Sequence, residues 1–369
     1  MPFNILTPAS SAESSVSIPV DTFKRFIKFA RQVVPDKTTI PILGQVLIYS
    51  DNGKGYLLAT NLECFVRVEI NGAGKGKLDM TVGFKALDMM ISRLSSGSVL
   101  VELNGTMLSF KSGAVRFEMA GSNGIDYPVM KRVTGISDKA TWTTQELRYV
   151  VQNIASVASV DSSRLDLQGV LVSIDGDTCD FMASDRHTLV CTSEAHDNRY
   201  NIPKILFNVL TAVEFMQPIN VEFGSDTVKV SCGSMTTTCT YIKIPFPAMV
   251  NSLIPKTFKY QYKLNVVKLR GHLTKMINLS NRPADSGIPV AVNLKKNTFY
   301  VDMMDVGCTS AETVDEDSWI KLDARRWLHA LERFNDVVDI SAGFNEPNSP
   351  TLWWDTHAKT IVMPMVTLR

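Results

Sequence analysis

The feature that most constrains the fold is a pattern that occurs three times along the chain, at intervals of about 120 residues. Each copy opens with an amphipathic helical pattern, and its equivalent apolar anchors are Phe23, Leu147 and Leu269. A second helical pattern in each copy begins near Phe84, Pro203 and Asp323. Apolar residues recur at helical spacing in all six segments. The chain therefore predicts three like-built domains rather than one large core.

Alternating runs typical of β-strands follow each helical pattern. They are Val46–Tyr49, Gly55–Ala59, Val99–Leu103, Val170–Ile174, Val221–Phe223, Val228–Ser231, Phe299–Met303 and the residues around Trp353. Turn pairs such as Asn104–Gly105 and Asp175–Gly176 separate them. Each third is therefore predicted as helix, strands, helix, strands, which is an α+β fold. We place the domains at residues 1–132, 133–257 and 258–369.

Charge separates between the predicted helices and the remainder of the chain. We take the helices as 20–34, 83–95, 144–158, 202–216, 265–282 and 322–335. They hold 15 of the 38 Lys and Arg residues but 6 of the 37 Asp and Glu residues, a net charge of +9 against −8 for the remainder. If sheets form an outer shell and helices an inner layer, that layer attracts phosphates without reading bases. The alternative is an ordinary solvated charged face on each helix.

Sequence motifs for catalysis, cofactors or metals are incomplete. The glycines of Gly72–Lys77 lack phosphate-loop spacing, so we expect a flexible turn there. Asp185 and His187 are candidates for acid–base chemistry, but no nucleophile elbow accompanies them. The six cysteines form no CxxC pair and the five histidines no HxH or HxxxH pair, so we expect no metal or cofactor and reduced structural thiols.

The chain also lacks an apolar run of the roughly 20 residues that a membrane helix needs. The Ser-rich start, Met1–Ser15, has no apolar signal core, and we expect it to be a short frayed leader. These observations predict a cytoplasmic protein without a membrane partner.

Seven short motifs, in order along almost the whole chain, resemble bacterial DNA polymerase III beta subunits, the sliding clamps. They are Thr39–Gly44, Ala59–Glu63, Gly169–Val172, Ala183–Leu189, Phe246–Pro247 leading to Ile254–Pro255, Leu279–Asn281 and Ile361–Met365. Each motif alone is weak evidence for this family, but the order of the motifs together with the threefold repeat is strong evidence. The chain is thus similar to a divergent member of that family.

The resemblance implies three repeated clamp domains, with antiparallel sheets outside and helices lining the inside of a head-to-tail dimeric ring. Such a ring encircles duplex DNA without sequence preference, tethers the replicative polymerase and other replication or repair proteins, and confers processivity. An ATP-driven clamp loader opens it. The resemblance implies a processivity factor that has no catalytic site and needs no cofactor.

Three sets of functional residues follow from the resemblance and the charge pattern. The DNA-facing set is Lys24, Lys28, Arg31, Lys37, Lys85, Arg148, Lys204, Lys268, Lys275 and Arg326. The partner-peptide pocket, which takes short apolar motifs, is Leu167, Ser184, His187, Leu189, Pro247, Val362, Met363, Pro364 and Met365. The dimer interface is Arg116, Phe117, Met119 and Leu279, with acidic residues Glu312, Asp315 and Glu316 opposite the basic edge.

The sequence departs from the family pattern at the pocket rim, where Arg186 and Thr188 replace the usual Gly and Arg. Asp161 stands where clamps often carry a polar DNA-facing residue, which puts DNA contact by that loop in doubt. Two other functions remain open at this point. One is a hydrolase that uses Asp185 and His187, and the other is a monomeric repeat-type binding protein.

Overall fold

The computed structural model describes residues 14–176, 178–196, 198–213, 218–280, 282–283, 287–293, 298–301, 319–334, 338–355 and 359–365. The chain forms two compact units. Unit 1 comprises residues 1–147 and 205–241, and unit 2 comprises residues 148–204 and 242–369. The middle third of the chain contributes to both units. The three domain boundaries given above therefore stay a prediction.

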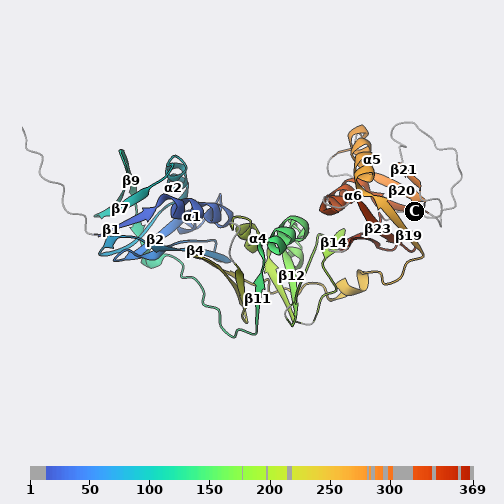
Figure 1. Cartoon of the computed structure of the whole chain (residues 1–369), viewed down its shortest axis with the longest axis horizontal. Coiled ribbons are helices and arrows are strands. Elements are labelled where there is room, and N and C mark those ends of the chain that lie inside the picture. Colours follow the sequence, from blue (N-terminus) through green and yellow to red (C-terminus); the bar gives the residue numbers. More distant parts are fainter. Residues whose placement is uncertain are drawn as a thin grey trace, which may run out of the picture. The chain divides into compact units, whose positions relative to one another are not determined.

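Unit 1 contains a nine-stranded and a five-stranded sheet (Figure 1). Their strands are β1 (Ser14–Pro19), β2 (Gln45–Asp51), β3 (Lys54–Thr60), β4 (Cys64–Asn71), β5 (Gly74–Lys75), β6 (Lys77–Gly83), β7 (Ser98–Asn104), β8 (Met107–Ser112), β9 (Val115–Ala120), β10 (Ser122–Asn123), β11 (Asp138–Trp142), β16 (Ile219–Phe223), β17 (Thr227–Cys232) and β18 (Met235–Thr240). The larger sheet runs β10-β6-β2-β3-β4-β18-β17-β16-β11 and the smaller β5-β1-β7-β8-β9. All pairs among these strands are antiparallel.

The nine-stranded sheet joins segments that are distant in sequence. Strand β4 of the first third pairs with β18 of the middle third, with Cys64 opposite Cys239 and Val68 opposite Met235. The backbone hydrogen bonds of the two thirds therefore continue through one sheet. This shared sheet explains why three copies of the sequence repeat form only two compact units.

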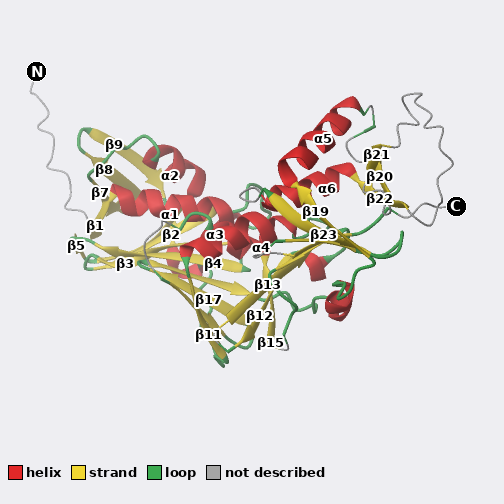
Figure 2. Ribbon diagram, turned by 45° about the vertical axis from the view of Figure 1, so that its right-hand side comes forward, coloured by secondary structure: helices red, strands yellow, loops and turns green. Residues whose placement is uncertain are grey.

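Helices in unit 1 bury one face against these strands. They include α1 (Val20–Val33), α2 (Phe84–Ile91), the first residues of α3 (Thr144–Tyr149) and most of α4 (Lys204–Leu210). Helix α1 lies across β3 and β4 and buries Phe23, Phe26 and Phe29 (Figure 2). Its apolar residues recur every three or four positions, so the charged residues are left on the opposite face. Trp142 stacks on Phe207 at 6.3 Å between ring centroids in the same unit.

Unit 2 contains an eight-stranded sheet, ordered β15-β12-β13-β14-β25-β24-β23-β19, and a three-stranded sheet, ordered β21-β20-β22. The strands are β12 (Gly169–Asp175), β13 (Thr178–Ser184), β14 (Thr188–Cys191), β15 (Asn198–Pro203), β19 (Tyr260–Asn265), β20 (Pro289–Asn293), β21 (Thr298–Val301), β22 (Trp319–Asp323), β23 (Asp339–Phe344), β24 (Thr351–Trp354) and β25 (Lys359–Val362). Strand β14 of the middle third pairs with β25 of the last third. A shared sheet again joins two thirds of the chain.

Helices α5 (Val266–Leu279) and α6 (Ala324–Leu331) pack against each other in unit 2 (Figure 2). Beneath them lies a core that contains Trp327 and Trp353, whose rings are 4.9 Å apart and fully buried. Asp323 caps α6, because its carboxylate accepts the N–H of Arg325. Helix α6 therefore starts at the residue that the sequence favours as its beginning.

All six predicted helices are present, and each starts within two residues of the predicted position. Residues 214–216, 281 and 335 of the predicted ranges lie outside the described residues. The predicted third helix is regular only over Thr144–Tyr149. It continues as a π-helical turn, Val150–Ile154, and a 3-10 turn, Ala155–Val157. The predicted strands are confirmed as well, except that residues 302–303 of the Phe299–Met303 run lie outside the described residues.

Two local expectations need correction. Ser14 and Ser15 belong to strand β1, not to a frayed leader, because they pair with Leu103 and Glu102 of β7. The turn Gly72–Lys77 is ordered and includes the short strand β5. A Cβ at Gly72 would lie 2.0 Å from the carbonyl oxygen of Ser17. The glycine therefore permits the close approach of β1.

Candidate functional surfaces

The exposed face of the first two helices is basic, but some of its charge is already paired. Arg31 donates two hydrogen bonds to the carboxylate of Asp88, at 2.9 and 2.6 Å. The ammonium of Lys24 donates to the carbonyl of Ser95 at 3.0 Å, and that of Lys85 to the carbonyl of Asp36 at 3.3 Å. An anion can still approach these groups, since all three lie at the protein surface. Lys28 and Lys37 are also exposed.

Helix α5 carries three Lys and Arg residues, Lys268, Arg270 and Lys275. It contains no acidic residue, and its buried side is formed by Val266, Leu269 and Leu273. Lys268 and Lys275 are exposed on its surface, and neither forms an ion pair with the part of the chain that the structure describes. Attraction of a polyanion by this surface stays a prediction.

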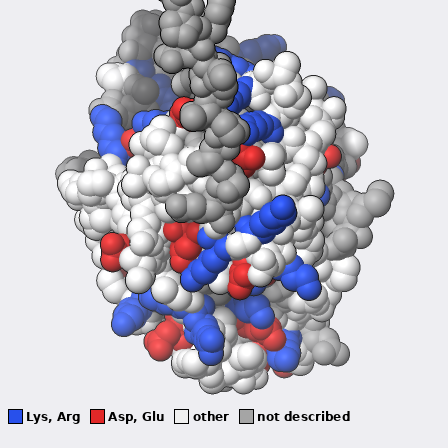
Figure 3. All heavy atoms as spheres, turned by 90° about the vertical axis from the view of Figure 1, so that its left-hand side faces the viewer, with Lys and Arg blue, Asp and Glu red and all other residues white. Residues whose placement is uncertain are grey.

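Strands of unit 1, in contrast, carry charges of both signs as neighbours. Figure 3 shows blue and red side chains next to each other over the visible end of this unit. The pairs include Lys77 with Asp79, Lys111 with Glu102, and Arg116 with Glu118. Exposed pairs of this kind contribute little to stability and cancel each other's field at a distance. The sheet surface seen here is therefore mixed in charge.

Two residues of the predicted DNA-facing set are engaged elsewhere. The ammonium of Lys204 donates to the carbonyls of Ser156 and Ala158, at 3.3 and 3.4 Å, and burial lowers its pKa. Arg326 lies 3.5 Å from the carboxylate of Asp323 and close enough to His187 to lower the pKa of that imidazole. Arg326 therefore acts electrostatically on His187, one of the predicted partner-peptide residues.

Predicted partner-peptide residues from distant segments come together in unit 2. Strands β14 and β25 place Thr188 opposite Val362, and the N–H of Met363 donates to the carbonyl of His187 at 2.8 Å. Leu167 and Leu189 belong to one apolar cluster, against which Met363 packs. We call this set the partner cluster. Its further buried members are Leu171, Met182, Cys191, Ala195, Phe246, Val250, Ile254, Leu352 and Ile361.

The strand register places Val362, one residue of the predicted partner-peptide pocket, on the face of β25 that points away from the partner cluster. Ile361 points into the partner cluster, whereas Val362 packs in the core around Trp327 and Trp353. Neighbouring residues of a strand face opposite sides, so both cannot line the same surface. Pro247, Pro364 and Met365 are partly exposed, and the N–H of Met365 donates to the carbonyl of Lys321 at 2.8 Å.

Aromatic residues that the sequence reasoning missed lie at the same cluster. Phe258 stacks on Trp354 at 5.2 Å between ring centroids, and both pack against the partner cluster. Phe246, directly before the predicted Pro247, is buried within it. An apolar surface with aromatic and Met side chains suits Leu or Phe anchors of a peptide.

Asp185 and His187 lie in the turn between β13 and β14, where the side chain of Asp185 binds the backbone of the turn. One carboxylate oxygen of Asp185 accepts the N–H groups of His187 and Thr188, at 2.9 and 2.6 Å. The hydroxyl of Ser184 donates to the carbonyl of Thr188 at 2.9 Å. Arg186 has a φ of +83°, a conformation that favours glycine. Burial, followed by the charge of Arg326, lowers the pKa of His187.

Strand β9 offers an open edge for association. It pairs only with β8 among the described strands, and Phe117, opposite Phe110, is partly exposed together with Met119. Arg116 is exposed and forms a 2.7 Å ion pair with Glu118. Leu279, at the end of α5, is 64% exposed. The expected acidic partners Glu312, Asp315 and Glu316 lie outside the described residues.

The described residues contain no cluster of three or more His, Cys, Asp or Glu side chains that could hold a metal ion. The five cysteines in the described segments form no disulfide with one another. Across those segments, no helix has both the length and the apolar character to cross a membrane.

Comparisons with known proteins agree with this fold. Residues 15–131 match the model of the DNA polymerase III beta subunit N-terminal domain. A beta sliding clamp of Chlamydia trachomatis is 27% identical over 92% of this chain and 84% of its own length. One of Chlamydia muridarum is 22% identical over 92% of this chain and 95% of its own. The crystal structure of the DNA polymerase III beta subunit of Thermotoga maritima covers 96% of this chain and all of its own with a TM-score of 0.83, at 21% identity.

Proposed function

Since the chain is a divergent member of the DNA polymerase III beta subunit family, the sliding clamps, we propose that it acts as a DNA sliding clamp. Two copies close head to tail into a ring around duplex DNA. The ring tethers the replicative polymerase and other replication or repair proteins, and so confers processivity. A clamp loader places it on DNA.

The observation that carries this proposal is the likeness to sliding clamps over almost the whole length of the chain, in sequence and in fold. The surface of α5 supports it, because a helix with Lys268 and Lys275 and no acid attracts phosphates irrespective of base sequence. A closed ring retains DNA topologically. Its contacts can therefore be weak and sequence-blind, which permits sliding.

We propose the partner cluster as the place where polymerase and loader peptides dock. Its buried part is apolar, and Met363 at its edge is flexible enough to adapt to several side chains. A synthetic peptide with Leu and Phe anchors provides the test. We expect Met363→Glu to abolish its binding, whereas Met249→Glu, at an exposed Met outside the cluster, leaves binding unchanged. Equal binding by both variants would place the docking site elsewhere.

The same protein is proposed to have no catalytic site of its own. Asp185, the candidate acid of a hydrolase, uses one carboxylate oxygen to organise the backbone of its turn. We therefore expect phosphoesterase and esterase assays to give the same background rate for the wild type and for His187→Ala. Turnover that disappears in His187→Ala would favour the hydrolase.

We propose that ring closure uses the open edge of β9, with Phe117 as the central apolar contact. Phe117→Ala is expected to shift the subunits from dimer to monomer as the protein is diluted, because removal of a buried aromatic anchor at an interface costs about 2 kcal/mol or more. Sedimentation velocity over a dilution series measures this, with Val115→Ala on the same strand as the control. A wild type that sediments as a monomer at every concentration would favour the monomeric binding protein instead.

A further inference from the structure

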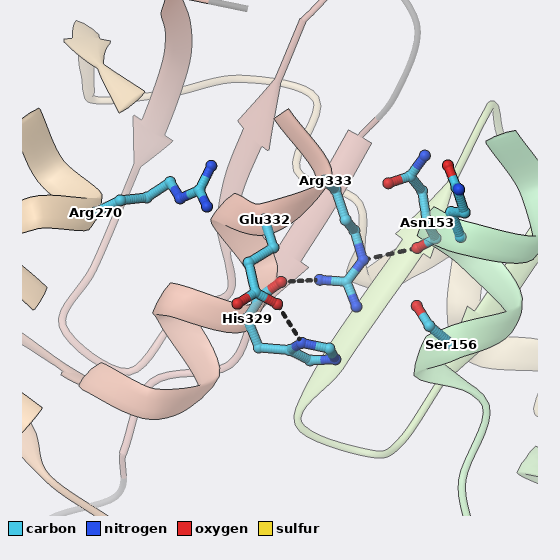
Figure 4. A pocket seen from close by; sticks show the side chains of 7 residues that line it. Asn153, Ser156, Arg270, His329, Glu332 and Arg333 are labelled. Atoms are coloured by element: carbon cyan, nitrogen blue, oxygen red, sulfur yellow. Dashed lines mark hydrogen bonds and ion pairs between the residues drawn. The ribbon is translucent and has the colours of Figure 1, made fainter. Parts of the chain in front are cut away.

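A polar cavity lies in unit 2 beside the end of α6. It has a volume of about 440 Å³ and seven lining residues, namely Gln152, Asn153, Ser156, Arg270, His329, Glu332 and Arg333 (Figure 4). Four of them, Gln152, Ser156, His329 and Glu332, are exposed residues, so solutes can reach the cavity. None of the seven is aliphatic, and none is Phe, Tyr or Trp. The lining therefore disfavours a nucleobase, a lipid chain or an apolar peptide.

Arg333 is fixed at the base of this cavity. Its Nε donates to the carbonyl of Asn153, and its Nη1 donates to the carbonyl of His329, each at 2.7 Å. Asn153 belongs to the π-helical turn of the middle third, and His329 to α6 of the last third. The side chain is held from both sides, and Figure 4 shows its guanidinium pointing toward the space between His329 and Ser156.

The third guanidinium nitrogen of Arg333, Nη2, is buried and has no hydrogen-bond partner among the residues that the structure describes. The residue as a whole is 7% exposed. Burial lowers the pKa of Arg333 to about 10 and outweighs the opposite effect of the Asp185 and Glu332 carboxylates nearby. A buried donor without an acceptor is costly, and a charged one is compensated best by an anion.

Other lining residues supply donors around the same space. Arg270 reaches the cavity from α5, the hydroxyl of Ser156 from the middle third, and the imidazole of His329 from α6 (Figure 4). Gln152 of the middle third also lines the cavity. Glu332 is the one acid in the lining, and its carboxylate is 3.1 Å from Nδ1 of His329. That contact directs the carboxylate toward the imidazole. Donors that converge from several directions match a tetrahedral oxyanion better than a planar carboxylate.

We propose that this cavity is a binding site for a phosphate group, supplied either by the backbone of duplex DNA or by free inorganic phosphate. Arg333 and Arg270 carry the charge that binds it, and Ser156 and Gln152 complete its hydrogen bonds. The site itself does not depend on the clamp function. Only the assignment of the phosphate to encircled DNA rests on that function.

The test compares two variants that each remove one charge from α5. Arg270→Gln alters the cavity, whereas Lys275→Gln removes an exposed cation that does not line it. Binding of inorganic phosphate is measured by isothermal titration, and binding of a fluorescent 30-base-pair duplex by anisotropy. We expect Arg270→Gln to weaken phosphate binding roughly tenfold or more, as for loss of a hydrogen bond to a charged group, and Lys275→Gln to weaken it less than twofold.

A third variant, Arg333→Lys, keeps the charge but cannot reach both carbonyls and the ligand. It is expected to lose phosphate binding as well, with circular dichroism as the check on folding. If it does not fold, Arg270→Gln still decides the matter.

The duplex separates the two sources. For the duplex the comparison is Lys256→Gln, which removes an exposed cation outside the helices and outside the DNA-facing set. A greater loss of duplex binding in Arg270→Gln than in Lys256→Gln assigns the site to DNA, and an equal loss assigns it to free phosphate. Phosphate binding that is absent in the wild type, or equally weakened by Arg270→Gln and Lys275→Gln, overturns the proposal. The clamp function is judged separately, by retention on circular DNA, and can fail while phosphate still binds.

Discussion

Replacing Lys268 and Lys275 together by Gln is expected to flatten the salt dependence of DNA binding. Both side chains are exposed on α5, which has no acid to compensate them. Each phosphate contact contributes about 0.9 to the slope of log affinity against log salt concentration, because it releases condensed counterions. A ring of two chains carries four of these lysines. If half or more of them contact phosphates, the slope becomes shallower by roughly 2 to 4.

A matched control removes the same charge elsewhere in unit 2. Lys256 and Lys259 lie outside the helices, have side chains that are 74% and 59% exposed, and lie 3.5 and 3.6 Å from Glu194 and Glu346. The Lys256→Gln, Lys259→Gln double variant is expected to leave the slope within experimental error. Fluorescence anisotropy of a labelled duplex between 50 and 200 mM salt measures both, a range over which several contacts change affinity about 10³-fold or more. Equal flattening in the two double variants would refute the reasoning, because net charge and not the α5 surface would then govern binding.

Three further predictions concern single residues. Arg186→Gly is expected to raise the free energy of unfolding by about 0.5–1 kcal/mol in urea denaturation, because φ is +83° at this residue and an L side chain is strained there. Arg186→Ala is expected to give no gain. An equal gain for both variants would implicate the charge of Arg186 instead of its backbone conformation. Asp323→Ala removes the cap of α6 and is expected to lower the free energy of unfolding by about 1–2 kcal/mol in the same assay. Asp323→Asn keeps the acceptor and is expected to be closer to wild type in stability. Equal losses of stability in the two variants would argue against the capping hydrogen bond. In Arg326→Gln the pKa of His187 is expected to rise toward its ordinary value in an NMR titration, since burial and then the charge of Arg326 disfavour the imidazolium. Because the folded-state pKa is depressed, the associated stability is present above the unfolded pKa and lost as pH falls through the folded pKa. An unchanged titration would exclude Arg326 as a cause of the lowered pKa.

The helices and most strands were predictable because their patterns are local. In α1 the recurrence of Phe23, Phe26 and Ala30 shows which face is buried without reference to any other segment. Asp323 and the residues after it form a recognisable start signal for α6. The order of the family motifs placed His187 and Met363 in one predicted set, and the structure joins the two residues by a backbone hydrogen bond.

Features that depend on pairing between distant segments were not predictable from pattern alone. The joining of β4 to β18 depends on register across more than 160 residues, which no local periodicity encodes. The same limit explains why the sequence led to Val362 and not Ile361 as a residue of the partner-peptide pocket, because a shift of one residue along a strand exchanges its two faces. No sequence pattern marked Arg333 as a candidate site residue, since a lone arginine at a helix end is ordinarily solvated. Its role comes from carbonyls of Asn153 and His329, and Asn153 is 180 residues away in the chain.

The most direct measurement of the central claim is retention on circular DNA. Subunits diluted until they dissociate are mixed with a nicked circular plasmid, concentrated so that rings close, and passed through a gel-filtration column at 0.3 M salt. If the chain forms a ring around DNA, protein elutes with the circle and is released when a restriction enzyme cuts the plasmid once, because the ring slides off the ends. Protein that remains bound after linearisation, or that never elutes with the circle although the subunits form dimers, would contradict the account.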